Sequence, residues 1–267
     1  MKLATYLENV REKKPLVHHI TNYVTVNDCA NACLAIGASP VMADAIDEAE
    51  DMTAISSALV LNIGTLNVTK VESMMAAGRK ANTLGIPVIF DPVGCGATPF
   101  RNRMAQELMN HVHMSVVRGN ISEILSLGGE NVKTKGVDAG DADEKLAVTA
   151  AKALAKHWNT VVVISEAIDI VTDGDRVTYV KNGCPEMSAI TGSGCMCTSL
   201  IGAFCGANPQ AMQEAAATAM IAMGISGENA WKLYGKQGLG HFHMGLIDEL
   251  GHMDANTLEK EASYEEA

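Results

Sequence analysis

Three segments of this sequence place polar residues and glycines directly after short apolar runs, where they could bind phosphate or a metal ion. The first is Phe90 to Thr98, in which Asp91 ends an apolar run and Gly94 and Gly96 follow it. Asp91 could cap a turn that the glycines allow to bend, or its carboxylate could serve as a ligand for a divalent cation. From this segment alone both interpretations stay open.

The second segment, Val117 to Glu123, combines a helix-start signal with a basic residue. Asn120 can cap the following helix while Glu123 lies at its third position, which is a capping-box arrangement. Arg118, at a strand end and followed by glycine, also stands where a phosphate-binding guanidinium would. The segment therefore predicts a helix start and is compatible with an anion site.

The third segment, Ala189 to Cys197, carries a Gly-x-Gly loop that leads into a helix without charged residues. Backbone N–H groups at a helix N-terminus bind anions, and Gly192 and Gly194 would let a phosphate approach the backbone closely. The glycines could instead serve close packing, but the segment offers a hydroxyl, free amides and the Cys195 thiol together. A thiol at a helix N-terminus is also expected to have a lowered pKa.

Other sequence patterns with a known chemistry do not occur. The chain has no G-x-x-x-x-G-K-[ST], no strand followed by G-x-G-x-x-G, no H-E-x-x-H and no Cys-x-x-Cys. Its paired histidines are interpreted as scaffold or surface residues, and Cys29 and Cys33, one helical turn apart, as packing residues. The sequence thus disfavours a P-loop protein and a dinucleotide-binding fold.

The elements that must position the three segments alternate between apolar strands and amphipathic helices. The ranges expected as strands are 15–20, 39–42, 58–63, 86–91, 114–118 and 161–165. The ranges expected as helices among them are 27–36, 47–57, 68–84, 101–111 and 143–157. Near-continuous apolar strands, each followed by a helix, indicate a parallel sheet covered on both faces, and ligands bind at the carboxyl ends of such strands.

The pattern changes after residue 165. Residues 168–172 and 177–180 flank Asp173-Gly174, which predicts an antiparallel hairpin late in the sheet. The last third is expected to be helical over 194–205, 210–233 and 241–253, with a frayed acidic end from Leu258. The fold class is therefore α/β, a three-layer α/β/α arrangement with a mostly parallel central sheet. We expect residues 1–267 to form a single domain, because no linker divides them.

The composition indicates which binding partners are disfavoured and in which cell compartment the protein is expected. The formal net charge of −11 argues against nucleic acid or an anionic membrane as a partner. Seven cysteines, an odd number, and an N-terminus without an apolar signal segment favour reduced thiols in the cytoplasm. The charge-free stretch 187–213 is interrupted by Pro209 and is more typical of a buried helix than of a membrane span.

In order and spacing, four motifs resemble the hydroxyethylthiazole kinase family within the ribokinase-like superfamily. They are HHITNYVTVNDCANACLAIGASPVM, FDPVGCGAT, VRGNISEI and AITGSGCMCTSL, and the resemblance runs from about Pro15 to Trp231. It implies ATP- and Mg²⁺-dependent phosphorylation of the hydroxyl of 4-methyl-5-(2-hydroxyethyl)thiazole for thiamin phosphate biosynthesis and salvage. It also implies a homotrimer with active sites at subunit interfaces.

The resemblance implies roles for individual residues. Asp91 and Glu123 match the positions that hold Mg²⁺, directly or through water. The positions matching ATP-contacting residues are Arg118, Ser165 and Gly194, and those matching the thiazole pocket are Met42, Gly192 and Asn22. Cys195 occupies the position where most ribokinase-like enzymes have a catalytic aspartate, and we expect it to help as a base or by orienting the alcohol.

The sequence departs from the family pattern beside the expected ATP site. Ser165 stands where relatives commonly have threonine, which keeps the hydroxyl, and Ser193 replaces threonine in the glycine loop. Glu166 follows where glycine is frequent and could bring a negative charge near the phosphates.

Other activities remain open from the sequence. The alternatives are another ribokinase-like small-alcohol kinase, of the hydroxymethylpyrimidine type or for repair of hydrated nicotinamide cofactors, and a non-catalytic thiazole- or nucleotide-binding protein. A thiol hydrolase with Cys195 as nucleophile lacks a histidine placed by sequence to activate it.

Overall fold

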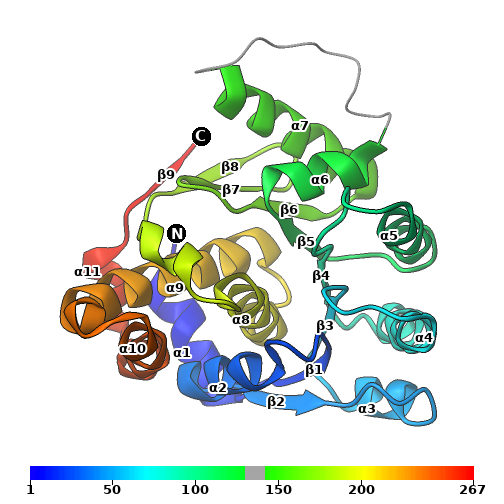
Figure 1. The fold of residues 1–267 in the computed structure, drawn as a ribbon, viewed down its shortest axis with the longest axis horizontal. Coiled ribbons are helices and arrows are strands. Elements are labelled where there is room, and N and C mark those ends of the chain that lie inside the picture. Colours follow the sequence, from blue (N-terminus) through cyan, green and yellow to red (C-terminus); the bar gives the residue numbers. More distant parts are fainter. Residues whose placement is uncertain (130–141) are drawn as a thin grey trace.

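The computed structural model describes residues 1–129 and 142–267, and within them one nine-stranded sheet forms the centre of the molecule (Figure 1). The strands lie in the order β2-β1-β3-β4-β5-β6-β7-β8-β9, with parallel pairing from β2 to β6 and antiparallel pairing from β6 to β9. Their bounds are β1 Leu16–Ile20, β2 Ser39–Met42, β3 Ala58–Asn62, β4 Val88–Asp91, β5 Val116–Gly119, β6 Val161–Ile164, β7 Asp169–Thr172, β8 Val177–Val180 and β9 Tyr264–Glu266.

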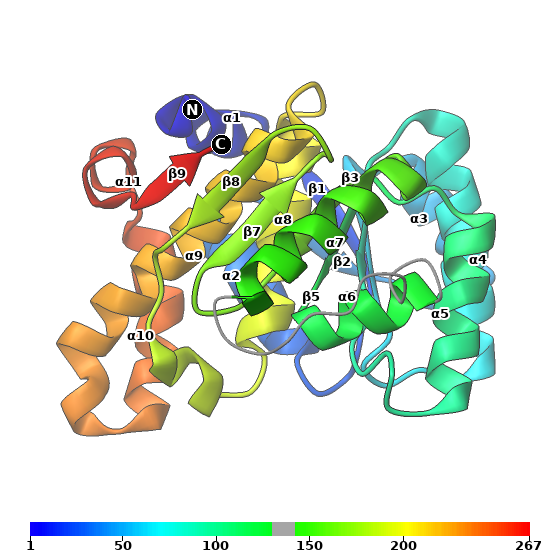
Figure 2. The same ribbon diagram turned by 90° about the horizontal axis from the view of Figure 1, so that it is seen from above.

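Helices cover both faces of the sheet, as Figures 1 and 2 show. One face carries α1 Leu3–Lys13, α2 Val26–Ile36, α8 Ser193–Ala207, α9 Met212–Tyr234, α10 Leu239–His252 and α11 Ala255–Glu261. The other carries α3 Ala49–Ala54, α4 Val68–Leu84, α5 Pro99–His111, α6 Ile121–Gly128 and α7 Ala142–Trp158. The predicted three-layer α/β/α architecture and the late hairpin β7–β8 are confirmed.

Two separate apolar cores follow from the alternation of side chains along each strand. In β3, Val60 packs into the core under α8 and α9, whereas Leu59 and Leu61 pack into the core under α4 and α5. Successive side chains of a strand point to opposite faces, so a strand buried on both faces must be apolar throughout. This explains why the strands could be recognised in the sequence as continuous apolar runs.

The parallel strands end at one edge of the sheet, and the polar residues of the motifs lie there. Asn62 ends β3, Asp91 ends β4, and Gly119 ends β5. The capping box predicted after β5 is present: Asn120 Oδ1 accepts a bond from the Glu123 amide at 2.8 Å, and Glu123 Oε2 accepts one from the Asn120 amide at 3.0 Å.

Several element boundaries differ from the sequence expectation. The helix expected over 47–57 is α3, six residues long and preceded by Glu48 rather than capped by Asp47. The prediction of a frayed C-terminus from Leu258 is wrong, because Leu258 is fully buried in α11 and Tyr264–Glu266 extends the sheet as β9. Strand β8 supplies the backbone partners of β9, and the acidic side chains of β9 face solvent, with an ion pair from Lys181 to Glu265 at 3.0 Å.

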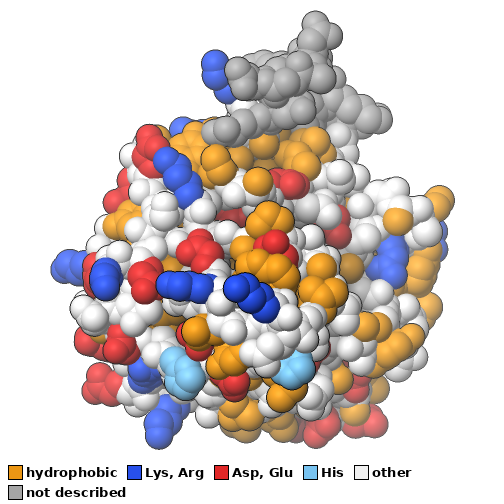
Figure 3. Space-filling view, turned by 60° about the vertical axis from the view of Figure 1, so that its left-hand side comes forward, with side chains coloured by type: hydrophobic (Ala, Val, Ile, Leu, Met, Phe, Trp, Pro, Cys, Tyr) orange, Lys and Arg blue, Asp and Glu red, His pale blue; other side chains and the backbone are white. Residues whose placement is uncertain are grey.

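The molecular surface mixes charges of both signs. On the face shown in Figure 3, Lys and Arg side chains are interspersed with Asp and Glu, as is usual for a solvated surface. Within the described residues, no helix is both long enough and apolar enough to cross a membrane.

Candidate active site

The carboxylate of Asp91 lies buried at the end of β4, with one oxygen anchored and the other free. Its Oδ2 accepts hydrogen bonds from Asn62 Nδ2 at 2.9 Å and from Thr198 Oγ1 at 2.8 Å. Its Oδ1 is buried without a hydrogen-bond partner among the described residues. A buried polar atom left unpaired costs free energy, so Oδ1 is suited to a ligand or a cation.

Arg118, the third residue of β5, lies beside this carboxylate. Its Nη1 is 3.9 Å from Asp91 Oδ2, its side chain is only 13% exposed, and its buried Nε has no partner among the described residues. Burial raises the pKa of Asp91 to about 6, and the Arg118 guanidinium opposes that rise. Because its Nε has no partner among the described residues, the Arg118 guanidinium can still donate hydrogen bonds to an anion.

The N-terminus of α8 adds backbone amides next to the guanidinium. Gly192 precedes the helix with φ +91°, a conformation that favours glycine, and Ser193 and Gly194 form the first turn. A Cβ at Gly194 would come within 2.7 Å of Arg118 Nη1, so the close approach requires glycine. A helix N-terminus and a guanidinium this close together form an anion site.

Cys195 lies on the other side of this site and is held by two amides. Its Sγ accepts hydrogen bonds from Asn22 Nδ2 at 3.3 Å and from Asn62 Nδ2 at 3.4 Å. Burial, and secondly the charge of Asp91, raise the pKa of the Cys195 thiol. The predicted lowering of this pKa at the helix N-terminus is therefore wrong, because burial outweighs the helix dipole, and at neutral pH the group is a thiol.

Asn62 and Thr198 connect the cluster and were not singled out from the sequence. Asn62 donates to both Asp91 and Cys195, while its Oδ1 accepts from Asn22 Nδ2 at 3.0 Å. Thr198 lies one turn after Gly194 and also bonds to its carbonyl oxygen at 3.2 Å. A polar residue ending an otherwise apolar strand was the available signal for Asn62.

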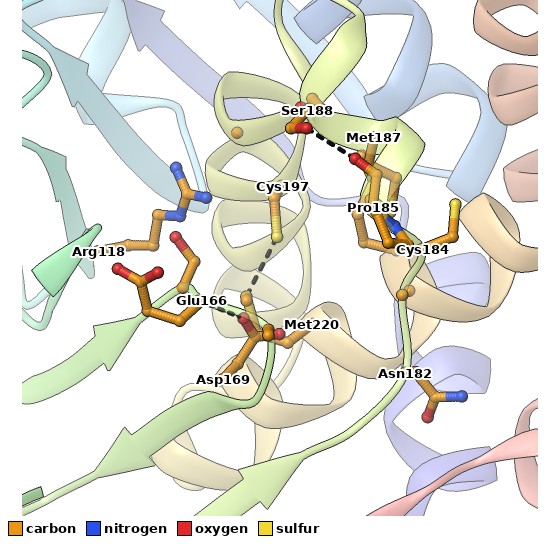
Figure 4. Close-up of a pocket in the computed structure, with 17 residues that line it drawn as sticks. Arg118, Glu166, Asp169, Asn182, Cys184, Pro185, Met187, Ser188, Cys197 and Met220 are labelled. Atoms are coloured by element: carbon orange, nitrogen blue, oxygen red, sulfur yellow. Dashed lines mark hydrogen bonds between the residues drawn. The ribbon is translucent and has the colours of Figure 1, made fainter. Parts of the chain in front are cut away.

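A cavity of about 510 Å³ opens beside Arg118, and Figure 4 shows the side chains around it. Arg118, Ser165 and Gly194 line it, so the structure brings together the three residues expected to contact ATP. Such a volume lies within the range of small-ligand sites. Its lining continues from these residues to residues 182–188 and to α9.

The side chain of Glu166, which stands where relatives frequently have glycine, is directed toward the backbone of α6. Its Oε1 accepts a hydrogen bond from the Ile121 amide at 3.0 Å, at the positive end of that helix. Asp169 accepts a bond from the Glu166 amide at 3.0 Å, and burial raises the pKa of Asp169 to about 7. The negative charge of Glu166 is thereby partly compensated before any phosphate is present.

The remaining expected site residues lie at the same edge of the sheet. Glu123 Oε1 accepts a bond from the Gly94 amide at 2.8 Å, and its other oxygen serves the capping box. Gly192 approaches Thr25, whose hydroxyl donates to Asn22 Oδ1 at 3.1 Å. Met42 ends the edge strand β2, paired with His19 of β1, outside the hydrogen-bonded cluster.

These residues fit Mg²⁺ bound together with phosphates. Mg²⁺ is usually held by one or two carboxylates plus phosphate oxygens and water. Asp91 Oδ1 is free for direct contact, whereas both oxygens of Glu123 already accept bonds, so contact through water suits Glu123 better. Within the described residues, no group of three or more His, Cys, Asp or Glu side chains could hold a metal unaided.

Comparison with known proteins gives consistent matches along nearly the whole chain. The model of the hydroxyethylthiazole kinase family matches residues 7–256. A hydroxyethylthiazole kinase of Clostridium beijerinckii is 53% identical over 264 residues, covering 97% of this chain and 95% of the relative. That of Ruminiclostridium cellulolyticum is 50% identical over 267 residues, covering 99% of this chain and 97% of the relative.

Solved structures agree with the fold. The hydroxyethylthiazole kinase protein of Pyrococcus horikoshii superposes with a TM-score of 0.91 at 38% identity, over 99% of this chain and 98% of that one. A ribokinase-like superfamily protein of Enterococcus faecalis superposes with a TM-score of 0.64 at 12% identity, over 96% of this chain and 89% of that one. The second likeness concerns the fold alone, which is ribokinase-like.

Proposed function

Because this chain belongs to the hydroxyethylthiazole kinase family, we propose that it acts as a single kinase domain over residues 1–267. It transfers the terminal phosphoryl group of ATP to the hydroxyl of 4-methyl-5-(2-hydroxyethyl)thiazole, for thiamin phosphate biosynthesis and salvage. The observation that carries the proposal is that Arg118, whose Nη1 is 3.9 Å from the buried Asp91 carboxylate, lines one cavity of small-ligand size together with the α8 N-terminus.

The phosphates are bound by charge and by backbone amides. Arg118 and the amides at Gly194 hold the phosphoryl group, and Ser165 contributes a hydroxyl at the cavity wall. Asp91, with Glu123 through water, would hold Mg²⁺, which neutralises charge on the phosphates. Phosphoryl transfer has a loose transition state, so this positioning and charge compensation account for most of the catalysis.

The alcohol is placed from the side of Cys195. Asn22, Gly192 and Met42 contribute to the thiazole pocket, and the neutral thiol of Cys195 orients the hydroxyl toward the phosphate. Asn62 fixes the spacing, since it bonds at once to Cys195 and to Asp91. A general base adds about 10²–10⁴-fold at most, so a thiol that only orients the alcohol still permits turnover.

Purified protein incubated with Mg-ATP and the hydroxyethylthiazole is expected to form the phosphorylated thiazole, detected by mass spectrometry. EDTA should stop product formation, because Asp91 and the phosphates need a cation between them. Binding of both ligands without product would contradict the proposal and favour a sensor. Product only from another small alcohol, such as a hydroxymethylpyrimidine, would assign a different ribokinase-like kinase.

The active enzyme is proposed to be a homotrimer with active sites at subunit interfaces. Exposed apolar side chains occur on the segments that connect β1, β2 and β3: Tyr23, Val24, Leu34, Ile46 and Ile55. Exposed large apolar side chains near an edge strand support an interface on this part of the surface. Light scattering is expected to give the mass of three chains, and a single-chain mass at assay concentration would contradict the assembly.

A cytoplasmic location is proposed on the state of the cysteines. All seven are free thiols in the structure, and five of them are buried: Cys29, Cys33, Cys95, Cys197 and Cys205. Reducing conditions keep such thiols unpaired.

A further inference from the structure

The cavity beside Arg118 has two chemically different ends. The end at Arg118 also carries Ser193 and Gly194 at the α8 N-terminus, which are suited to phosphate. The opposite end is formed by residues 182–188 and by α9. In Figure 4, Arg118 and Glu166 lie on one side, while Cys184, Pro185 and Met187 lie on the other. A nucleotide with its phosphates at Arg118 would place its base toward this opposite end.

The hydrogen-bonding side chains at the opposite end already donate to other parts of the protein. Asn182 Nδ2 donates to Glu261 O at 3.0 Å and to Glu228 Oε1 at 3.3 Å, and Asn182 Oδ1 accepts from the Ser263 amide at 2.7 Å. These bonds use both hydrogens of the amide, so Asn182 cannot bond to a base without giving one up.

The two other polar side chains of this loop that line the cavity are similarly engaged. Cys184 Sγ donates to Gly227 O at 3.5 Å, and the exposed Ser188 Oγ donates to Pro185 O at 2.7 Å. The Gly183 amide is bonded to Glu228 Oε1 at 2.7 Å. The side-chain donors of this loop that line the cavity are therefore committed to fixing residues 182–188.

The surface left for a base is mainly thioether and other apolar surface. Pro185 and Met187 lie at this end, and Met220, Met223 and Gly224 of α9 continue the lining of the cavity. Methionine side chains are unbranched and polarizable, so they repack around ligands of different shape. Methionine-rich surfaces are typical of sites that accept several partners.

We propose that this site recognises nucleoside triphosphates through their phosphates and accepts purine bases other than adenine. The inference rests on the proposed function, since it concerns the phosphoryl donor of that reaction. An apolar pocket discriminates between similar groups by about 10–200-fold, whereas a site built to hydrogen-bond reaches about 10⁴-fold or more. Pyrimidine nucleotides should be somewhat poorer donors, because a smaller base buries less apolar surface.

Initial rates of thiazole phosphorylation with ATP, GTP and ITP test the selectivity, with CTP and UTP as the smaller bases. Values of kcat/KM for the three purine donors are expected to lie within about 10²-fold of one another. A loss of more than about 10²-fold when GTP replaces ATP would overturn the inference. Calorimetric measurement of the affinities for the same nucleotides distinguishes a failure of the proposed function from a failure of the relaxed base selectivity. Similar affinities for these nucleotides without any turnover would contradict only the proposed function. Binding of ATP alone would overturn the relaxed base selectivity.

A substitution at the opposite end tests whether the base lies there. Met187→Ala is expected to weaken ATP and GTP by the same factor, about fivefold, while the affinity for inorganic tripolyphosphate stays unchanged. Met244→Ala, at an exposed position of α10, is the matched control and should change neither affinity. An equal loss for tripolyphosphate and for the nucleotides would place the base elsewhere and overturn the assignment.

Discussion

Asp91→Asn is expected to lower kcat by about 10³-fold or more while the protein stays folded. Asparagine keeps the shape and can still accept the bonds from Asn62 and Thr198 through its oxygen. It removes the charge that would face Mg²⁺ at the unpaired Oδ1 and the charge that offsets Arg118. Steady-state kinetics with saturating Mg-ATP and thiazole measure the loss.

Cys195→Ala, compared with Asp91→Asn, shows which of the two residues contributes more to catalysis. Its thiol is neutral and held by Asn22 and Asn62, so its removal should cost only about 10–10²-fold. If Cys195→Ala abolished turnover while Asp91→Asn barely lowered it, the roles assigned to the two residues would be reversed.

The same Asp91→Asn substitution should leave the metal-free protein as stable as the parent at pH 8, or more stable. Burial raises the pKa of Asp91 to about 6, above its value in the unfolded chain, so the folded state prefers the protonated acid. The parent therefore loses stability as the pH rises through about 4 to 6, by on the order of 2–3 kcal/mol. The asparagine side chain of the variant does not titrate, so the stability difference between variant and parent should grow over that range and then level off.

Urea unfolding in EDTA at pH 5 and pH 8 measures this difference. Strong destabilisation by Asp91→Asn at pH 8 would show that the carboxylate serves the fold rather than the reaction. The expected opposition of stability and activity is what a buried charge retained for function predicts.

The elements that carry the site could be predicted because their signals are local. Apolar strands buried on both faces read as continuous runs, and Asp91 and Arg118 stand out where such runs end. The capping box of α6 could likewise be predicted from the sequence, because Asn120 and Glu123 bond to each other within one turn.

Features that depend on distant contacts could not be predicted in the same way. Asn62 joins Asp91 and Cys195 only because β3 lies beside β4 and under the start of α8, an arrangement set by strand order. The pKa of Cys195 depends on how deeply the chain buries it, which overrides the local effect of the helix end. Strand β9 forms because β8 leaves an edge free for Tyr264–Glu266, far away in sequence.

Arg118→Met is expected to lower kcat/KM for ATP by about 10³-fold and to destabilise the protein. The guanidinium lies 3.9 Å from Asp91 Oδ2, and its charge also acts on the buried carboxyl of Asp169. Removing the guanidinium leaves the buried carboxylates of Asp91 and Asp169 without the positive charge that opposes their burial, which costs about 3–5 kcal/mol, whereas in Asp91→Asn the guanidinium still has Asp169. Nucleotide titration and urea unfolding at pH 7.5 give the two quantities.

Two further variants separate phosphate binding from charge compensation. Arg118→Lys keeps the positive charge but loses the planar fork, so it should restore most of the stability while ATP affinity remains reduced. The double variant Arg118→Met with Asp91→Asn removes the uncompensated charge at Asp91, so it should be more stable than Arg118→Met alone and remain inactive. Equal stability of the single and double variants would show that Arg118 does not compensate Asp91. An unchanged ATP affinity in Arg118→Met would show that the phosphates bind elsewhere, since the cavity joins Arg118 to the amides at Gly194.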